Sequence, residues 1–77
     1  MDQKIKHIDF TDTMIVTMTT DGQIYHRPLS AFPLLLTASP STRLQYRIGK
    51  FGDDVRWESL DEDIHIASLT GQSALTA

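Results

Sequence analysis

The stretch MIVTMTTDGQIYHRP, residues 14–28, predicts a β-hairpin. Its first half alternates two sets of side chains and is rich in β-branched residues, which is typical of a strand. The dipeptide Asp21-Gly22 then favours a two-residue loop in a type I′ turn. A loop of that length would place Met18 opposite Tyr25.

A first helix is expected after Pro28, which ends the hairpin because it lacks the N–H that a strand ladder needs. Ser30 can cap this helix, and a proline is tolerated in its first turn. The helical spacing i, i+3, i+4 places three apolar side chains on the core face. They are Phe32, Leu35 and Leu36. Leu34 falls outside that face and is expected to be exposed.

The other expected elements are short. They are a strand over Lys4–Phe10, a helix from Pro40 to about Tyr46 capped by Ser39, strands over Gln45–Lys50 and Asp54–Trp57, and a helix over Ile64–Leu69 capped by Asp63 and ended by Gly71. The lone tryptophan, Trp57, is expected to anchor the core, because a small domain needs its largest ring inside.

These elements predict one α+β domain over residues 1–71. Three N-terminal strands with an Asp-Gly hairpin and one or two later short strands form a small antiparallel sheet, packed with one or two short helices. The small and polar residues 72–77 are expected to form a disordered tail.

Composition limits the classes of function. The 77 residues include no cysteine, which excludes disulfides and thiolate metal sites. No apolar run is long enough for a signal core or a membrane span, so a cytoplasmic protein without membrane association is expected. The sequence holds no G-x-S-x-G elbow, no phosphate loop and no metal-binding histidine spacing. We therefore expect no catalytic residues, no metal and no cofactor, and a protein that is not an enzyme.

Charge is distributed unevenly along the chain. Residues 53–63, called the acidic segment below, hold six acids and one arginine, a net charge of −5. The whole chain carries −3, so the remaining residues carry +2. A concentrated charge of one sign is a docking signal for a partner of the opposite sign. The candidate contact residues are Asp53, Asp54, Glu58, Asp61 and Glu62, with Leu34 as an apolar contact.

Several motifs along the chain resemble domain-of-unknown-function family 2442, a group of small bacterial proteins. They are the Asp-Gly dipeptide, PL-x-x-F-P-x-L-L-x-A-S-P-x-x-R (Pro28 to Arg43), Ile48-Gly49, and W-x-x-L-D-E-D-I-x-I-x-x-L (Trp57 to Leu69). The resemblance covers about residues 14–71 and implies a small α+β domain without a settled activity. Members are often encoded beside another small protein, which implies a toxin–antitoxin-like pair.

The chain departs from the family at polar positions. Members usually have Arg where Gln23 stands, Arg where Leu34 stands, and His-Trp-Pro in place of Arg56-Trp57-Glu58. The apolar framework is kept. A polar site that the family shared at these positions would be lost or altered here.

Three functions agree with these patterns. The first is a protein-binding module, an antitoxin-like partner or small inhibitor, that docks a basic protein through the acidic segment. The second is an accessory subunit of a larger complex. The third is a nucleic-acid-associated regulator using Arg43, Arg47 and Lys50 with aromatic rings between them, which the net negative charge disfavours. The exposed Leu34 also supports a weak homodimer.

Overall fold

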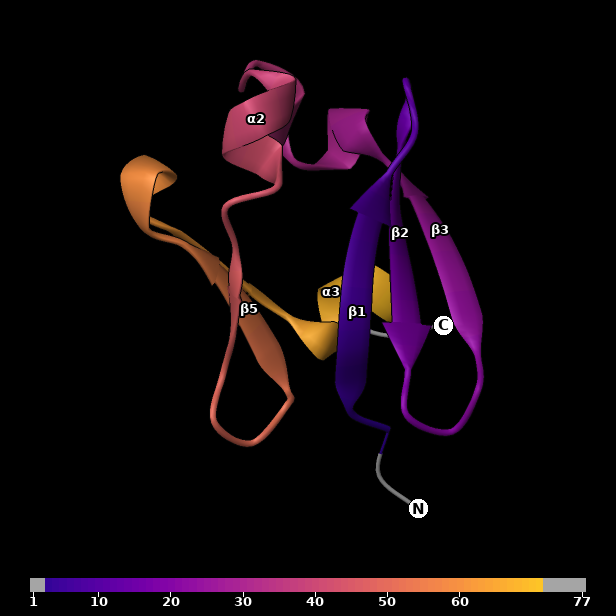
Figure 1. The fold of residues 1–77 in the computed structure, drawn as a ribbon. Coiled ribbons are helices and arrows are strands. Elements are labelled where there is room, and N and C mark those ends of the chain that lie inside the picture. The colour runs from indigo at the N-terminus through magenta and orange to yellow at the C-terminus, as the bar shows by residue number, and fades with distance from the viewer. Residues whose placement is uncertain (1–2, 72–77) are drawn as a thin grey trace.

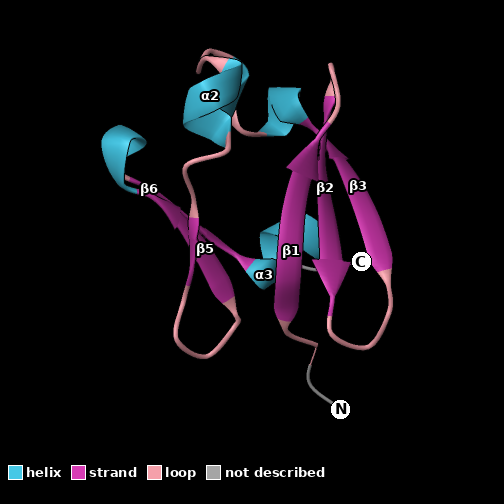
Figure 2. Ribbon diagram, viewed as in Figure 1, coloured by secondary structure: helices cyan, strands magenta, loops and turns pink. Residues whose placement is uncertain are grey.

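The structure is a computed structural model, and it describes residues 3–71 (Figure 1). Sheet A contains β1 (Ile5–Phe10), β2 (Met14–Thr19) and β3 (Ile24–Pro28), in that order. Sheet B contains β4 (Arg47–Ile48), β5 (Asp54–Trp57) and β6 (Glu62–His65). The helical elements are η1 (Leu29–Ala31), α1 (Pro33–Leu36), α2 (Pro40–Arg43), η2 (Glu58–Leu60) and α3 (Ile66–Thr70) (Figure 2). Antiparallel strands with short helices confirm the α+β prediction, but the strands form two three-stranded sheets and not the single predicted sheet.

The hairpin forms, but its register differs from the prediction by one residue. Tyr25 lies opposite Thr17, not Met18. The Thr19 N–H donates to the Gln23 carbonyl at 2.9 Å, so the loop has three residues and ends at Gly22, with φ 88°. The predicted two-residue turn was therefore wrong. A type I turn followed by a left-handed glycine gives this loop instead.

A side chain at the end of β2 stabilises the longer loop. The Thr19 hydroxyl donates to the Asp21 carboxylate and also accepts from the Gln23 N–H at 3.3 Å. The hydrogen bond from Thr19 is the main reason that the pKa of Asp21 lies below its usual value. The turn preference of the Asp-Gly dipeptide does not take such side-chain hydrogen bonds into account, and the sequence pattern therefore predicted the shorter turn.

An irregularity in β1 allows two isoleucines to reach the core. The pairing with β2 shifts between Ile5 and His7, so a bulge lies at this point. Ile5 and Ile8 are three residues apart and would face opposite ways on a regular strand. Both are buried, at 4% and 1% exposure.

The core lies between the two sheets and is centred on Trp57, as predicted. This ring is fully buried and contacts the rings of Phe10, at 6.5 Å between centroids, and Tyr46, at 6.1 Å. Its indole N–H donates to the Arg43 carbonyl at 2.9 Å. Trp57 therefore joins β5 to sheet A and to the end of α2.

The segment after Pro28 forms two short helices, not one. Ser30 lies inside η1 and makes no side-chain cap, contrary to the prediction. Leu34 is exposed as expected, but Leu36, predicted in the core, is 47% exposed. With only four residues, α1 has too few turns to bury two neighbouring leucines, and Leu35 takes the inner position.

Ser39 caps α2 as predicted, its hydroxyl accepting from the Thr42 N–H at 3.2 Å. At the C-terminal end, the helix predicted over Ile64–Leu69 was wrong in part. Residues 62–65 form β6, because Ile64 packs inward opposite Val55 while its neighbours point outward.

The last helix is consequently short and has a different cap. α3 begins at Ile66, and His65, not Asp63, caps it by accepting from the Ala67 N–H at 3.1 Å. Gly71 ends it with φ 78°, as expected. The predicted disordered tail, residues 72–77, lies outside the described residues. None of the helices over residues 3–71 has the length and apolar character needed to cross a membrane.

Candidate protein-docking surface

The acidic segment folds into β5, η2 and β6 and supplies most of the outer face of sheet B. Val55, Trp57 and Ile64 point inward and are buried. Alternation turns the residues between them outward. In the ladder, Asp54 lies opposite His65 and Arg56 opposite Asp63. Asp54, Arg56 and Asp63 therefore share the outer face, whereas Glu62, opposite the inward-pointing Trp57, lies on the other face of the sheet.

Arg56 neutralises two of the acids. Its guanidinium donates to Glu58, at 3.2 Å, and to Asp61, at 2.7 Å. Asp61 adopts a left-handed backbone conformation, φ 52°, at the end of η2. Both carboxylates raise the pKa of Arg56, the Asp61 hydrogen bond most strongly. Arg47 on β4 adds a longer contact of 4.0 Å to Glu58.

Asp54 and Asp63 form the part of the surface that is not neutralised. Partial burial is the main cause that raises the pKa of Asp54 above its usual value, and the Asp63 carboxyl raises it further. His65 acts in the opposite direction. The Asp54 carboxylate lies over Gly49, where a Cβ would overlap with it. Within residues 3–71, no lysine or arginine forms an ion pair with Asp53, Asp54 or Asp63.

The acidic segment also contains a free strand edge. β6 is the last strand of sheet B. The Ile66 N–H donates to the Asp53 carbonyl at 2.8 Å. Because backbone groups in an antiparallel ladder alternate, those of Asp63 and His65 then point away from β5. Within residues 3–71, no strand pairs with that side of β6.

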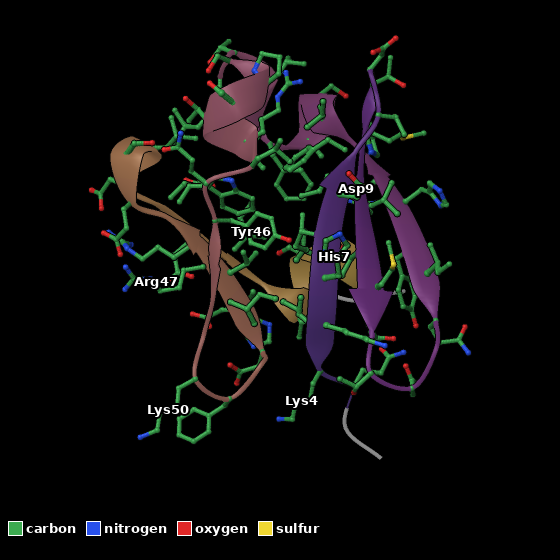
Figure 3. All side chains as sticks on the ribbon, viewed as in Figure 1. Lys4, His7, Asp9, Tyr46, Arg47 and Lys50 are labelled. Carbon is green, nitrogen blue, oxygen red and sulfur yellow. The ribbon has the colours of Figure 1, made fainter. Side chains whose placement is uncertain are left out.

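The edge of β1 in sheet A is better covered. On β1, the Ile5 N–H donates to the Gly52 carbonyl at 2.7 Å. Further along, the Tyr46 hydroxyl accepts from the Ile8 N–H and donates to the Ile8 carbonyl, at 3.2 and 2.9 Å. Figure 3 shows Tyr46 beside β1, near His7. β1 is therefore less accessible to a new strand than β6.

The residues suggested for nucleic-acid binding do not form one cationic surface. The Arg43 guanidinium donates to the carbonyls of Leu35, at 2.8 Å, and Leu36, at 2.9 Å. Arg43 thereby supplies hydrogen-bond partners for two carbonyls at the C-terminal end of α1. Arg47 is exposed but lies on the acidic face, and the Lys50 ammonium lies 5.7 Å from the Phe51 ring centroid (Figure 3).

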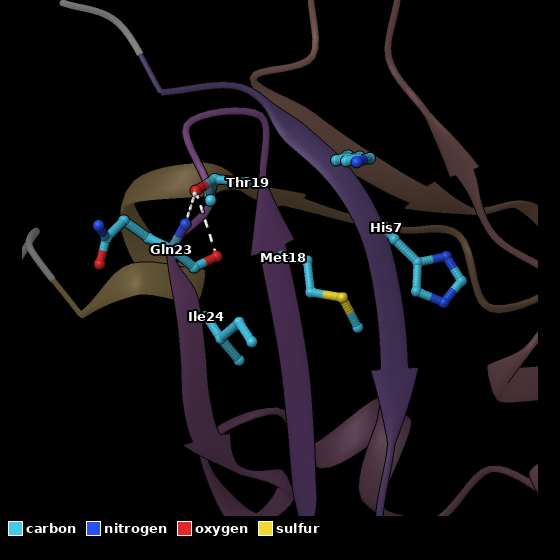
Figure 4. A pocket seen from close by; sticks show the side chains of 7 residues that line it. His7, Met18, Thr19, Gln23 and Ile24 are labelled. Atoms are coloured by element: carbon cyan, nitrogen blue, oxygen red, sulfur yellow. Dashed lines mark hydrogen bonds between the residues drawn. The ribbon is translucent and has the colours of Figure 1, made fainter.

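The outer face of sheet A carries a feature that the sequence analysis did not single out. A shallow pocket of about 460 Å³ lies there, lined in part by Lys6, His7, Met18 and Ile24 (Figure 4). The sequence held a signal for it, since one alternating set of β2, Met14, Val16 and Met18, is wholly apolar. The structure turns this set outward and buries the other set, Ile15, Thr17 and Thr19. Among residues 3–71, no three acidic or histidine side chains lie close enough to hold a metal ion.

Comparison with known families gives one match over most of the chain. The family described as "Protein of unknown function (DUF2442)" matches residues 5–73. The fold resembles a crystal structure of a protein of unknown function from Rhodospirillum rubrum ATCC 11170, at 2.75 Å resolution, with a TM-score of 0.73 and 20% identity over the whole of both chains. This likeness supports the fold. Comparison with curated proteins found no match.

Proposed function

We propose that this chain, which belongs to the DUF2442 family, is a non-enzymatic protein-binding module that docks a basic partner on sheet B. The observation that carries the proposal is the Asp54–Asp63 pair beside the free edge of β6. In this proposal the chain acts as an antitoxin-like partner or a small inhibitor of a basic protein. An accessory subunit would use the same surface.

Electrostatics supports a cationic partner. The raised pKa of Asp54 means that its charged form is disfavoured where it stands, by partial burial and by a second carboxylate. A lysine or arginine from a partner would stabilise both charges at once. The neutralised acids, Glu58 and Asp61, already have Arg56 and gain less from such a contact.

The strand edge supports a particular mode of docking. A basic segment in extended conformation can pair with Asp63 and His65, which point their backbone groups outward. Main-chain bonds then supply affinity, and the acidic side chains select lysine or arginine at alternate positions. Four residues of β6 make a short edge, so a second contact outside the strand is expected in a tight complex.

A defined basic peptide tests the proposal. A hexapeptide of alternating lysine and valine is titrated into the protein at low salt, and backbone amide shifts are followed by NMR. The largest shifts are expected at Asp63 and His65. The same peptide with N-methylated backbone amides should bind weakly, since it cannot pair with a strand edge.

A matched pair of triple variants separates this surface from bulk charge. Asp53→Asn/Asp54→Asn/Asp63→Asn removes the unpaired acids, whereas Asp12→Asn/Glu58→Gln/Asp61→Asn removes three others. Both change the net charge equally. The first is expected to weaken peptide binding about tenfold or more and the second much less. Equal weakening by both would reduce the acidic segment to a solvated charged face and would overturn the proposal.

A further inference from the structure

The outer face of sheet A has apolar side chains on its central strand, β2, and one of its rows has a polar residue at each side. In the ladder, His7, Met18 and Ile24 form one cross-strand row, and Asp9, Val16 and His26 form the next. Residues directly opposite each other in an antiparallel ladder lie on the same face. Figure 4 looks onto this face, and no helix or strand lies in front of it.

The apolar part of this face is only partly shielded. Ile24 is 58% exposed, and Met18 and Met14 are half-buried, while Val16 between them is 8% exposed. The inward residues of β2, Ile15, Thr17 and Thr19, are fully or almost fully buried. An antiparallel sheet that faces water normally carries polar residues on its outer side. Here the central strand carries Met14, Val16 and Met18 in its three outward positions, which indicates a surface that is covered in use.

We infer that this face is the interface of a weak homodimer whose two-fold axis runs along β2. Such an axis places β2 on the β2 of the second copy and β1 over its β3, without a shift along the strands. Asp9 then faces His26 of the second copy, and His26 faces Asp9 of that copy. Val16 meets Val16 between them.

The charges of this row make the face complementary to itself. Among residues 3–71, the Asp9 carboxylate accepts one hydrogen bond, from the adjacent Phe10 N–H at 2.8 Å. An imidazole can donate an N–H to a carboxylate whether or not it is charged. Sheets packed face to face lie about 10 Å apart, a gap that an aspartate and a histidine pointing at each other can fill. Because Val16 lies near the middle of β2, the twist between two packed sheets displaces this row least.

The size of the face sets the expected affinity. Three strands about 4.8 Å apart and three outward rows give a few hundred Å² per copy, below the roughly 800 Å² of a standard interface. The dissociation constant is therefore expected in the range of about 10 µM to 1 mM.

Sedimentation equilibrium over that concentration range tests the inference. The weight-average mass of the wild-type protein should rise above the monomer value of 8.7 kDa. Asp9→Lys places an ammonium opposite His26 of the second copy, and His26→Asp places two carboxylates opposite each other. Neither arrangement can form the pair, so each variant should weaken the dimer at least tenfold. Both positions are exposed, so the variants keep the fold.

The double variant Asp9→Lys/His26→Asp provides the decisive comparison, because it restores an opposite pair only under the proposed symmetry. It should dimerise again, while Asp12→Lys should behave as the wild type. A wild-type monomer at 1 mM, or a double variant that stays monomeric, would overturn the inference. A dimer that both single variants keep and Leu34→Glu loses would move the interface to α1.

Discussion

Asp54 is a side chain whose ionisation works against folding. Its pKa is raised above the ordinary value of 3.8 in the folded protein, so the folded state holds the proton more tightly than the unfolded chain does. Stability from this group is therefore present at low pH and is lost as the pH rises through the raised pKa. This pH dependence of stability is opposite in sign to that of a carboxylate in an ion pair, whose pKa is lowered.

Asp63→Asn should consequently stabilise the protein at neutral pH. The substitution removes the second carboxyl from beside Asp54, a like-charge cross-strand effect of about 0.2–1 kcal/mol. Thermal unfolding should show a higher melting temperature at pH 7, and the gain should shrink as the pH falls through the raised pKa of Asp54. Asp12→Asn is the control. A lower melting temperature at pH 7 would show that attraction between Arg56 and Asp63 outweighs the repulsion.

Gly22 is required by the backbone of the hairpin loop. Its φ of 88° is unfavourable for residues with a Cβ, yet a Cβ there would meet no atom within 4 Å. Gly22→Val is therefore expected to cost about 1–2 kcal/mol through backbone conformation alone. Gly22→Asn, which tolerates this region better, should cost less. Equal melting temperatures for wild type and Gly22→Val would contradict the three-residue loop.

At the level of elements, α1 depends on a side chain from α2. The Arg43 guanidinium donates to two carbonyls at the C-terminal end of α1, and α1 has only four residues. Hydrogen bonds from a charged group contribute about 1.5–3 kcal/mol. Arg43→Leu keeps the apolar stem and the backbone carbonyl that binds Trp57, so it should lose about that amount in urea unfolding. Arg47→Leu, at an exposed site, is the control and should change stability little.

The elements that were predicted best from the sequence are those determined by neighbouring residues in the chain. The alternation of β2 and the Ser39-Pro40 cap act within a few residues, and both were confirmed. β6 was missed because residues 62–65 become a strand only through pairing with β5, a tertiary effect. The acids of that segment are visible as a group in the sequence, but their division into neutralised and unneutralised groups depends on Arg56, whose contacts reach five residues along the chain.

At the level of the whole molecule, the two sheets are joined along β1. Sequence patterns predicted β1 as a strand but did not indicate that Tyr46 would form a hydrogen bond with Ile8, which lies 38 residues away. That contact occupies a backbone edge that would otherwise be open. The outer face of sheet A was also missed, because the alternation of β2 predicts a strand but not which set faces outward. The apolar set Met14, Val16 and Met18 faces outward, and Thr17 and Thr19 are buried.

Tyr46→Phe tests how far this one hydroxyl holds the sheets together. The ring keeps its packing on Trp57, but the N–H and carbonyl of Ile8 lose their shared partner. Leaving partly buried backbone groups unpaired costs about 1–3 kcal/mol. In a domain of this size each kcal/mol lowers the melting temperature by about 4–8 °C. Amide exchange at Ile8 should accelerate more than exchange on β2.

Tyr25→Phe is the matched control for this change. The Tyr25 hydroxyl also has a bond, at 2.6 Å, but its partner is the Gln3 side chain and no backbone group. Gln3 can turn to water when the hydroxyl is removed, so the cost should stay below that of Tyr46→Phe. If both variants lose the same stability, the hydroxyl at position 46 is not a link between the sheets, and Trp57 and the Ile5–Gly52 hydrogen bond join them without it.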